Sequence, residues 1–279
     1  MGPDPLARFL FDRIDLLGPA RNPTSISYAL PAVFPAFARA AWLGVLPEWN
    51  PFKYNSFPVN AARQTYLLTD VIQRQIERQA RAGSFRALPP ILTFQSVVDS
   101  TVSTRSVISV LYDGLPANGS ELVLYDLNRS VKLGPLLRPA ADAKLADLLP
   151  PRPRTYRTVV VTNLSADSRE VVERVVEPGE TTEHSRPLGL SFPAGVFSLS
   201  HIALPFPIDD PLYGLEPDPT EDFGIQLGAT AMRGERGVLV TSLDTLLRMP
   251  SNPFFAYQLA RIEAPLGPPA AGWTADRIR

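Results

Sequence analysis

Residues 88–104 (LPPILTFQSVVDSTVST) constrain the fold more than any other segment of this chain. Two adjacent prolines end the preceding secondary-structure element, and a run of apolar and β-branched residues follows. Asp99 then lies among hydroxyl residues just before a helical pattern. This order predicts a buried strand with a carboxylate at its C-terminal end. Because ligands and catalytic groups gather at that edge of open α/β sheets, Asp99 is the first candidate functional residue. The alternative is that Asp99 only caps the turn that follows the strand.

A second strand follows after one helical segment. The apolar positions Val107, Val110 and Leu111 predict a helix from about Thr104 that ends at Gly114. Residues 120–125 (SELVLY) then predict a strand. A strand, a crossover helix and a strand form a βαβ unit with parallel pairing. The sequence therefore predicts an α/β fold with a mostly parallel sheet and flanking helices.

Three later segments also carry strand patterns. Residues 155–163 are rich in β-branched residues, and residues 168–176 fit a helix and a strand equally well. Residues 195–204 alternate like a strand and bring His201 close to its end. An acidic residue after one strand and a histidine after a later one are thus the two candidate groups for acid–base chemistry.

The chain is expected to divide into an N-terminal segment of unassigned role, a cap-like aromatic and helical region, a core and a proline-rich tail: residues 1–29, 30–87, 88–265 and 266–279. Within the cap-like region, a proline-broken aromatic loop precedes a helix at residues 60–82, with Asn60 as its cap and Gly83 as its end. The core closes with a helix that begins at Asn252 and Pro253.

Composition excludes several classes of function. Lys and Arg total 27 and Asp and Glu total 28, so no net field would draw the protein to nucleic acid or anionic lipid. The absence of cysteine rules out a thiolate nucleophile and a zinc–thiolate site. With only two histidines, His184 and His201, a multi-histidine metal centre is not expected either. We expect no metal and no cofactor.

The most apolar long stretch does not predict a membrane span. Residues 28–47 contain Arg39 and the helix-breaking Pro31 and Pro35, which favour a buried or surface-binding helix instead. Residues 1–18 mix charged and apolar residues and lack the pattern of a signal peptide. A cytoplasmic location is therefore the expectation, and the sequence leaves the oligomeric state open.

Three motifs together resemble a known family. The motifs that carry this resemblance are residues 50–58 (NPFKYNSFP), residues 88–104 and residues 198–207 (SLSHIALPFP). The chain is similar to a bacterial branch of the α/β-hydrolases related to monoacylglycerol lipase, lysophospholipase and serine-aminopeptidase-type sequences. The likeness covers roughly residues 30–262. It implies that Asp99 matches the triad acid and His201 the triad base of the family. Asp126, at the end of the next strand, is the rival acid, and His184 is expected at the surface.

The chain departs from this family at the nucleophile. No serine has glycine at the second position on both sides, as the Gly-x-Ser-x-Gly elbow requires, and Ser191, which comes nearest, follows Asp99 instead of preceding it. The resemblance therefore implies the C-terminal part of such an enzyme, without the elbow region. The long spacing from Asp99 to His201 implies an insertion at about residues 128–195, before the last triad strand.

Two functions follow from the resemblance. One is a serine-hydrolase-type acyl hydrolase that cleaves esters of small apolar or lipid-like substrates, with the acid–base pair present and the nucleophile serine absent from this chain. The alternative is a non-catalytic remnant or binding module of the same fold. Both functions imply an incomplete α/β-hydrolase-type sheet, and this chain by itself is expected to be nearly inactive.

Overall fold

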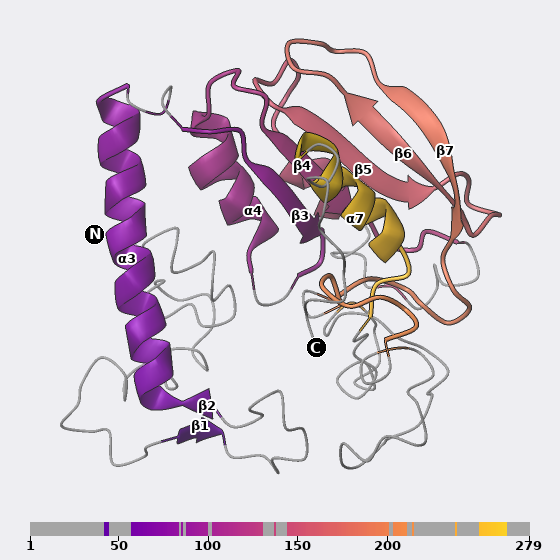
Figure 1. Cartoon of the computed structure of the whole chain (residues 1–279), viewed down its shortest axis with the longest axis horizontal. Helices are drawn as coiled ribbons and strands as arrows, with labels where there is room; N and C mark the ends of the chain where they lie inside the picture. The colour runs from indigo at the N-terminus through magenta and orange to yellow at the C-terminus, as the bar shows by residue number, and fades with distance from the viewer. Residues whose placement is uncertain are drawn as a thin grey trace, which may run out of the picture.

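A five-stranded sheet organises the computed structural model, which describes residues 42–44, 57–83, 85, 88–99, 102–130, 137, 144–200, 203–210, 214, 238 and 251–266. The strands lie side by side in the same order as in the sequence (Figure 1). Their bounds are β3 (Leu92–Ser96), β4 (Glu121–Tyr125), β5 (Arg157–Asn163), β6 (Glu170–Val176) and β7 (His184–Ser191).

The sheet is mixed and mostly parallel. Strands β3, β4 and β5 pair in parallel, with Leu92 opposite Glu121 and Glu121 opposite Arg157. Strand β6 is antiparallel to both of its neighbours, so β7 runs in the same direction as the first three strands. The predicted βαβ unit is confirmed, and the fold is of the α/β type.

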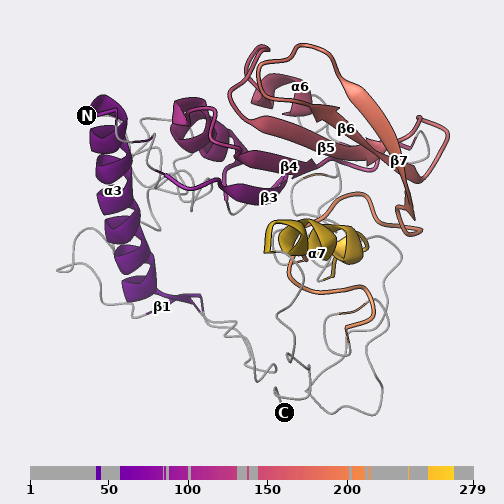
Figure 2. The same cartoon turned by 45° about the horizontal axis from the view of Figure 1, so that its top comes forward.

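Alternate residues of the central strands bury the two faces of the sheet. One face is covered by the helical turns after β3 and by α6 (Lys144–Leu148), and the side chains that pack there include Leu122, Leu124 and Val160. Val123 and Val159 pack on the opposite face, which α7 (Phe255–Glu263) covers together with neighbouring aromatic residues. Figure 2 shows α6 and α7 on opposite sides of the sheet. Both faces are buried, as parallel pairing requires.

The helix predicted at residues 104–114 is present in three pieces. A short α-helical turn, α4 (Thr104–Ser106), continues into a π-helical turn, η3 (Val107–Leu111), and a 3-10 turn, η4 (Tyr112–Gly114). Ser103 caps the start, where its hydroxyl accepts a hydrogen bond from the backbone N–H of Ser106 at 3.3 Å. The end at Gly114 is close-packed, since a Cβ there would lie 2.9 Å from the Phe85 ring.

Residues 128–195, expected to be an insertion, contribute three of the five strands of the sheet. Residues 155–163 were expected to be β-rich and contain β5. Residues 168–176, which fitted both a helix and a strand, contain β6. The alternation of a strand lets its valines bury both faces of the sheet, with Val171 and Val175 on one face and Val172 and Val176 on the other. A turn at Gly179, with φ at 79°, then leads into β7.

The long helix α3 (Val59–Arg81) forms close to the predicted bounds, but it does not pack on the sheet as the expected flanking helix would. Two of its apolar side chains, Leu68 and Ile72, are 57% and 37% exposed. Figures 1 and 2 show the reason, since α3 stands at one side of the sheet and does not lie across it. Asn60 lies inside the helix, and Pro58 occupies the N-cap position without a side-chain capping hydrogen bond. A two-stranded ribbon, β1 (Trp42–Gly44) and β2 (Phe57–Pro58), precedes α3.

No helix in the described ranges is long and apolar enough to cross a membrane. Of residues 28–47 the structure describes only residues 42–44, so the expectation for this stretch stays a prediction.

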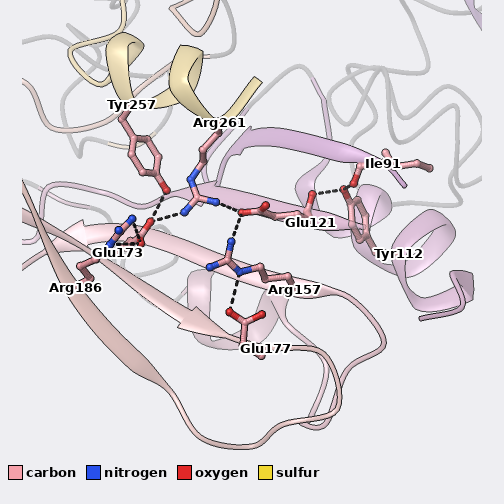
Figure 3. Close-up of polar contacts among 9 residues, drawn as sticks. All are labelled: Ile91, Tyr112, Glu121, Arg157, Glu173, Glu177, Arg186, Tyr257 and Arg261. Carbon is pink, nitrogen blue, oxygen red and sulfur yellow. Dashed lines mark hydrogen bonds and ion pairs between the residues drawn. The ribbon is translucent and has the colours of Figure 1, made fainter. Parts of the chain in front are cut away.

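An ion-pair network fastens α7 to the sheet (Figure 3). Arg261 pairs with Glu121 on β4 and with Glu173 on β6, and the Tyr257 hydroxyl donates a hydrogen bond to Glu173 at 2.9 Å. Glu173 is only 2% exposed. Burial by itself would raise the pKa of this carboxyl, but the hydrogen bonds from Tyr257 and Arg261 outweigh burial and hold the pKa below its ordinary value. Glu173 is therefore a buried, charged anchor for α7.

The start of α7 differs from the prediction by a few residues. Asn252 lies three residues before the helix, and its side-chain oxygen accepts a hydrogen bond from the Phe254 backbone N–H at 2.9 Å. Asn252 thus orders the turn that leads into α7 instead of capping the helix directly.

Candidate functional site

Polar residues gather where the first three strands of the sheet end. Asp99 follows β3, Asp126 and Asn128 follow β4, and Asn163 ends β5. All four side chains are buried. Because these strands are parallel, their carboxyl ends lie at the same edge of the sheet, where the sequence predicted a site.

Asp99 is held firmly at this edge. Asp99 is 2% exposed, and one of its carboxylate oxygens accepts a hydrogen bond from the Gln95 side-chain amide at 2.9 Å. The other oxygen accepts a hydrogen bond from the Val102 backbone N–H at 2.9 Å, so the predicted turn-capping role is confirmed. A carboxylate oxygen can accept more than one hydrogen bond, and capping therefore does not exclude a second role. These two bonds orient the carboxylate.

The chain crosses this edge of the sheet in an irregular, buried segment at residues 196–200. The predicted strand at residues 195–204 is wrong, since residues 197–200 do not pair as a strand. Instead, the Asn128 backbone N–H donates to the Phe197 carbonyl at 2.9 Å, and the Ser96 hydroxyl donates to the Leu199 carbonyl at 2.8 Å. Groups at the ends of β3 and β4 satisfy the buried carbonyls here, which removes the need for a ladder of strand hydrogen bonds.

The chain is also fixed where it leaves this edge. The Ala203 backbone N–H donates to the Ser200 carbonyl at 3.0 Å, and the Gln258 side chain of α7 donates to the Leu204 carbonyl at 3.1 Å. His201 lies outside the described residues, so its approach to Asp99 stays a prediction.

The rival acid, Asp126, already has a full set of partners. Its carboxylate, 1% exposed, accepts hydrogen bonds from Arg129 at 2.6 and 2.9 Å and from the Thr162 hydroxyl at 2.9 Å. It also accepts a hydrogen bond from the Leu127 backbone N–H at 2.8 Å, as expected of a turn former. Arg129 neutralises Asp126, which makes this carboxylate less suited to orient a histidine at the same edge.

Two other candidates do not belong to this site. His184 begins β7 and is exposed, as predicted, with Glu180 at 3.9 Å. Ser191 ends β7, four strand spacings from β3, or about 19 Å at the usual separation of neighbouring strands. That distance is too long for Ser191 to act with Asp99.

The part of the chain that the structure describes contains no group of three or more His, Cys, Asp or Glu residues placed to hold a metal ion. Gln95 and Asn128, which position the acid and the crossing segment, were not identified from the sequence. The signal for Gln95 was available, because it is a polar residue inside the otherwise apolar β3 run, four positions before Asp99.

No family model, curated protein or solved structure matches this chain.

Proposed function

We propose that the carboxyl edge of β3 and β4 is the acid–base part of a serine-hydrolase-type site that cleaves carboxylic esters. In this proposal His201 is the base and Asp99 orients it. The observation that carries the proposal is the placement of Asp99, a buried and pre-oriented carboxylate beside the segment that leads to His201. Ser96 ends β3 three residues before Asp99, and it also binds the Leu199 carbonyl, two residues before His201.

The chemistry of such a pair follows from the burial of the acid. A carboxylate that accepts the Nδ1–H of an imidazole fixes the ring orientation and leaves Nε2 free to remove a proton. It also stabilises the imidazolium that forms, and this effect is larger in a buried site than in water. Because Gln95 and Val102 already hold Asp99, little reorganisation would be needed when the histidine becomes charged.

The substrate class comes from the family resemblance. We infer a small apolar or lipid-like ester, with residues 30–57 forming a cap over the acyl group. The structure describes only residues 42–44 and 57 of this region, so the cap stays a prediction.

The second candidate function is a non-catalytic binding module of the same fold. The absence of a Gly-x-Ser-x-Gly motif favours it, because acyl transfer through a serine needs the strained elbow that presents the hydroxyl. The two candidates differ in whether His201 does any chemistry.

Residual ester hydrolysis separates the two candidates. At high protein concentration the chain should hydrolyse p-nitrophenyl butyrate measurably faster than buffer, because a positioned base contributes up to about 10²–10⁴-fold to the attack of water. His201→Ala should remove this residual rate, and Asp99→Asn should remove most of it. His184→Ala is the matched control and should keep the full rate, since His184 is exposed and remote from the site.

If His201→Ala hydrolyses the ester as fast as the parent chain, the acid–base proposal is wrong. A parent chain with no rate above that of buffer would instead support the binding module.

A further inference from the structure

A cleft of about 430 Å³ lies on the α6 face of the sheet, against β5 and β6. Four arginines line it, Arg129, Arg152, Arg154 and Arg174. Only two carboxylates line it with them, from Asp126 and Glu183. The described lining therefore carries an excess of positive charge in a protein whose overall charge is close to zero.

The two carboxylates are already engaged by three of the arginines. Asp126 binds Arg129 at 2.6 Å. Glu183 binds Arg152 at 2.6 Å and lies 4.0 Å from Arg174. No carboxylate of the described lining is left for Arg154.

Arg154 is the unusual member of the group. It is only 9% exposed, and its guanidinium donates to two neutral acceptors, the Pro150 carbonyl at 3.0 Å and the Thr158 hydroxyl at 3.4 Å. Among the described residues it forms no ion pair. Burial lowers the pKa of Arg154, which reflects the cost of keeping this cation away from water. The charges of Asp113 and Glu183 offset part of this cost without forming a direct ion pair with Arg154. A bound anion in direct contact with the guanidinium would offset more of it.

The same cleft has an apolar wall. Leu145 and Leu149 come from α6 and the residue after it, and Val160 and Val176 come from β5 and β6. An inorganic anion would satisfy the guanidinium but would leave this wall in water. An anion with a short hydrocarbon portion would cover both.

We propose that this cleft binds an organic oxyanion, a carboxylate or a phosphate monoester, with the charged group at Arg154 and a short apolar portion against α6. The planar guanidinium matches either oxyanion through paired hydrogen bonds. The cleft reaches the carboxyl edge through Asp126 and Asn163, but Asp99 does not line it, and its apolar wall comes from α6, β5 and β6. The proposal therefore does not depend on ester hydrolysis.

Calorimetric titration of the full chain at low salt tests the proposal with defined probes. Hexanoate and hexyl phosphate should each bind at one site, and the tighter of the two identifies the preferred oxyanion. Acetate and inorganic phosphate should bind at least about tenfold more weakly, because they bury no hydrocarbon chain. 1-Hexanol, which lacks the charge, should not bind.

Two variants connect the binding to the cleft. Arg154→Met should weaken the binding of hexanoate and hexyl phosphate at least about tenfold, as expected for the loss of a charge-assisted hydrogen bond. Arg105→Met is the matched control, because it removes the same charge at an exposed position outside the cleft lining. This control should bind both probes as the parent chain does.

Equal binding by Arg154→Met and the parent chain would overturn the proposal, and so would the absence of binding by both hexyl probes. Equally tight binding of 1-hexanol would also overturn it. If Arg154→Met does not fold, Arg174→Gln decides, because this half-exposed residue can change without disturbing the core. In that case unchanged binding by Arg174→Gln overturns the proposal, and weakened binding supports it.

Discussion

Replacing Arg261 by methionine should lower the free energy of unfolding by about 3–5 kcal/mol, the usual cost of removing one partner from a buried ion pair. The substitution keeps most of the apolar length of the side chain but leaves Glu121 and Glu173 without their shared cation (Figure 3). It also removes the guanidinium that lies 4.9 Å from the centre of the Tyr257 ring. Urea denaturation of the variant and the parent chain at pH 7 measures the difference.

A matched control separates the buried pair from surface charge. Arg186 also contacts Glu173, at 2.6 Å, but its side chain is 70% exposed. Arg186→Met should therefore cost no more than about 1 kcal/mol, because water screens and replaces an exposed partner. Equal losses for the two variants would contradict the assignment of Arg261 as the anchor of α7.

The same substitution should change the pH dependence of stability in a defined direction. In the parent chain the pKa of Glu173 is held below its ordinary value. The stabilising contribution of this carboxylate is therefore fully present above the carboxyl pKa of the unfolded chain, about 4.3. It is lost as the pH falls through the lower pKa of the folded chain. Without Arg261 the buried carboxylate is disfavoured at neutral pH and gains a proton more easily. The stability difference between parent and variant should therefore be largest near pH 7 and should shrink on acidification.

The purified chain should not react covalently with a fluorophosphonate probe. Such probes label an activated serine, and no serine here lies in the elbow motif of the resembled family. In a well-studied protease, loss of the nucleophile alone lowers the rate about a million-fold, even when the acid and base are intact. Turnover of p-nitrophenyl butyrate should therefore be lower by a similar factor than in an intact serine esterase.

Mass spectrometry of the probe-treated chain checks this result. Strong labelling at one serine, such as Ser56, Ser100 or Ser191, would show that a nucleophile exists outside the family pattern. It would also contradict the expectation that this chain by itself is nearly inactive.

The sequence predicted the central βαβ unit well because its signals are local. Two prolines and an apolar run define β3, and Gly114 separates the helical turns from β4. The segment at residues 168–176 could not be assigned from the sequence, because paired valines beside glutamate and arginine fit two periodicities. Its pairing with β5 decided the outcome, and this contact lies outside the segment itself.

The candidate site was predicted in part. The position of Asp99 at a strand end follows from the order of apolar and hydroxyl residues. The partners of Asp126 could not be predicted in the same way, because Arg129 and Thr162 bind it only after the loop and β5 are in place. The irregular path of residues 196–200 was missed because its alternating pattern comes from burial on all sides, not from a strand with one buried face.

The pairing of Asp99 with His201 is the central claim, and NMR titration of the two imidazoles tests it most directly. A neighbouring carboxylate stabilises the charged imidazole, so Asp99→Asn should lower the pKa of His201 by about one to two pH units. The His184 signals should not respond to this substitution, and Asp126→Asn should leave the pKa of His201 unchanged. If the pKa of His201 is the same with and without the Asp99 carboxylate, or if it falls only in Asp126→Asn, the claim is contradicted.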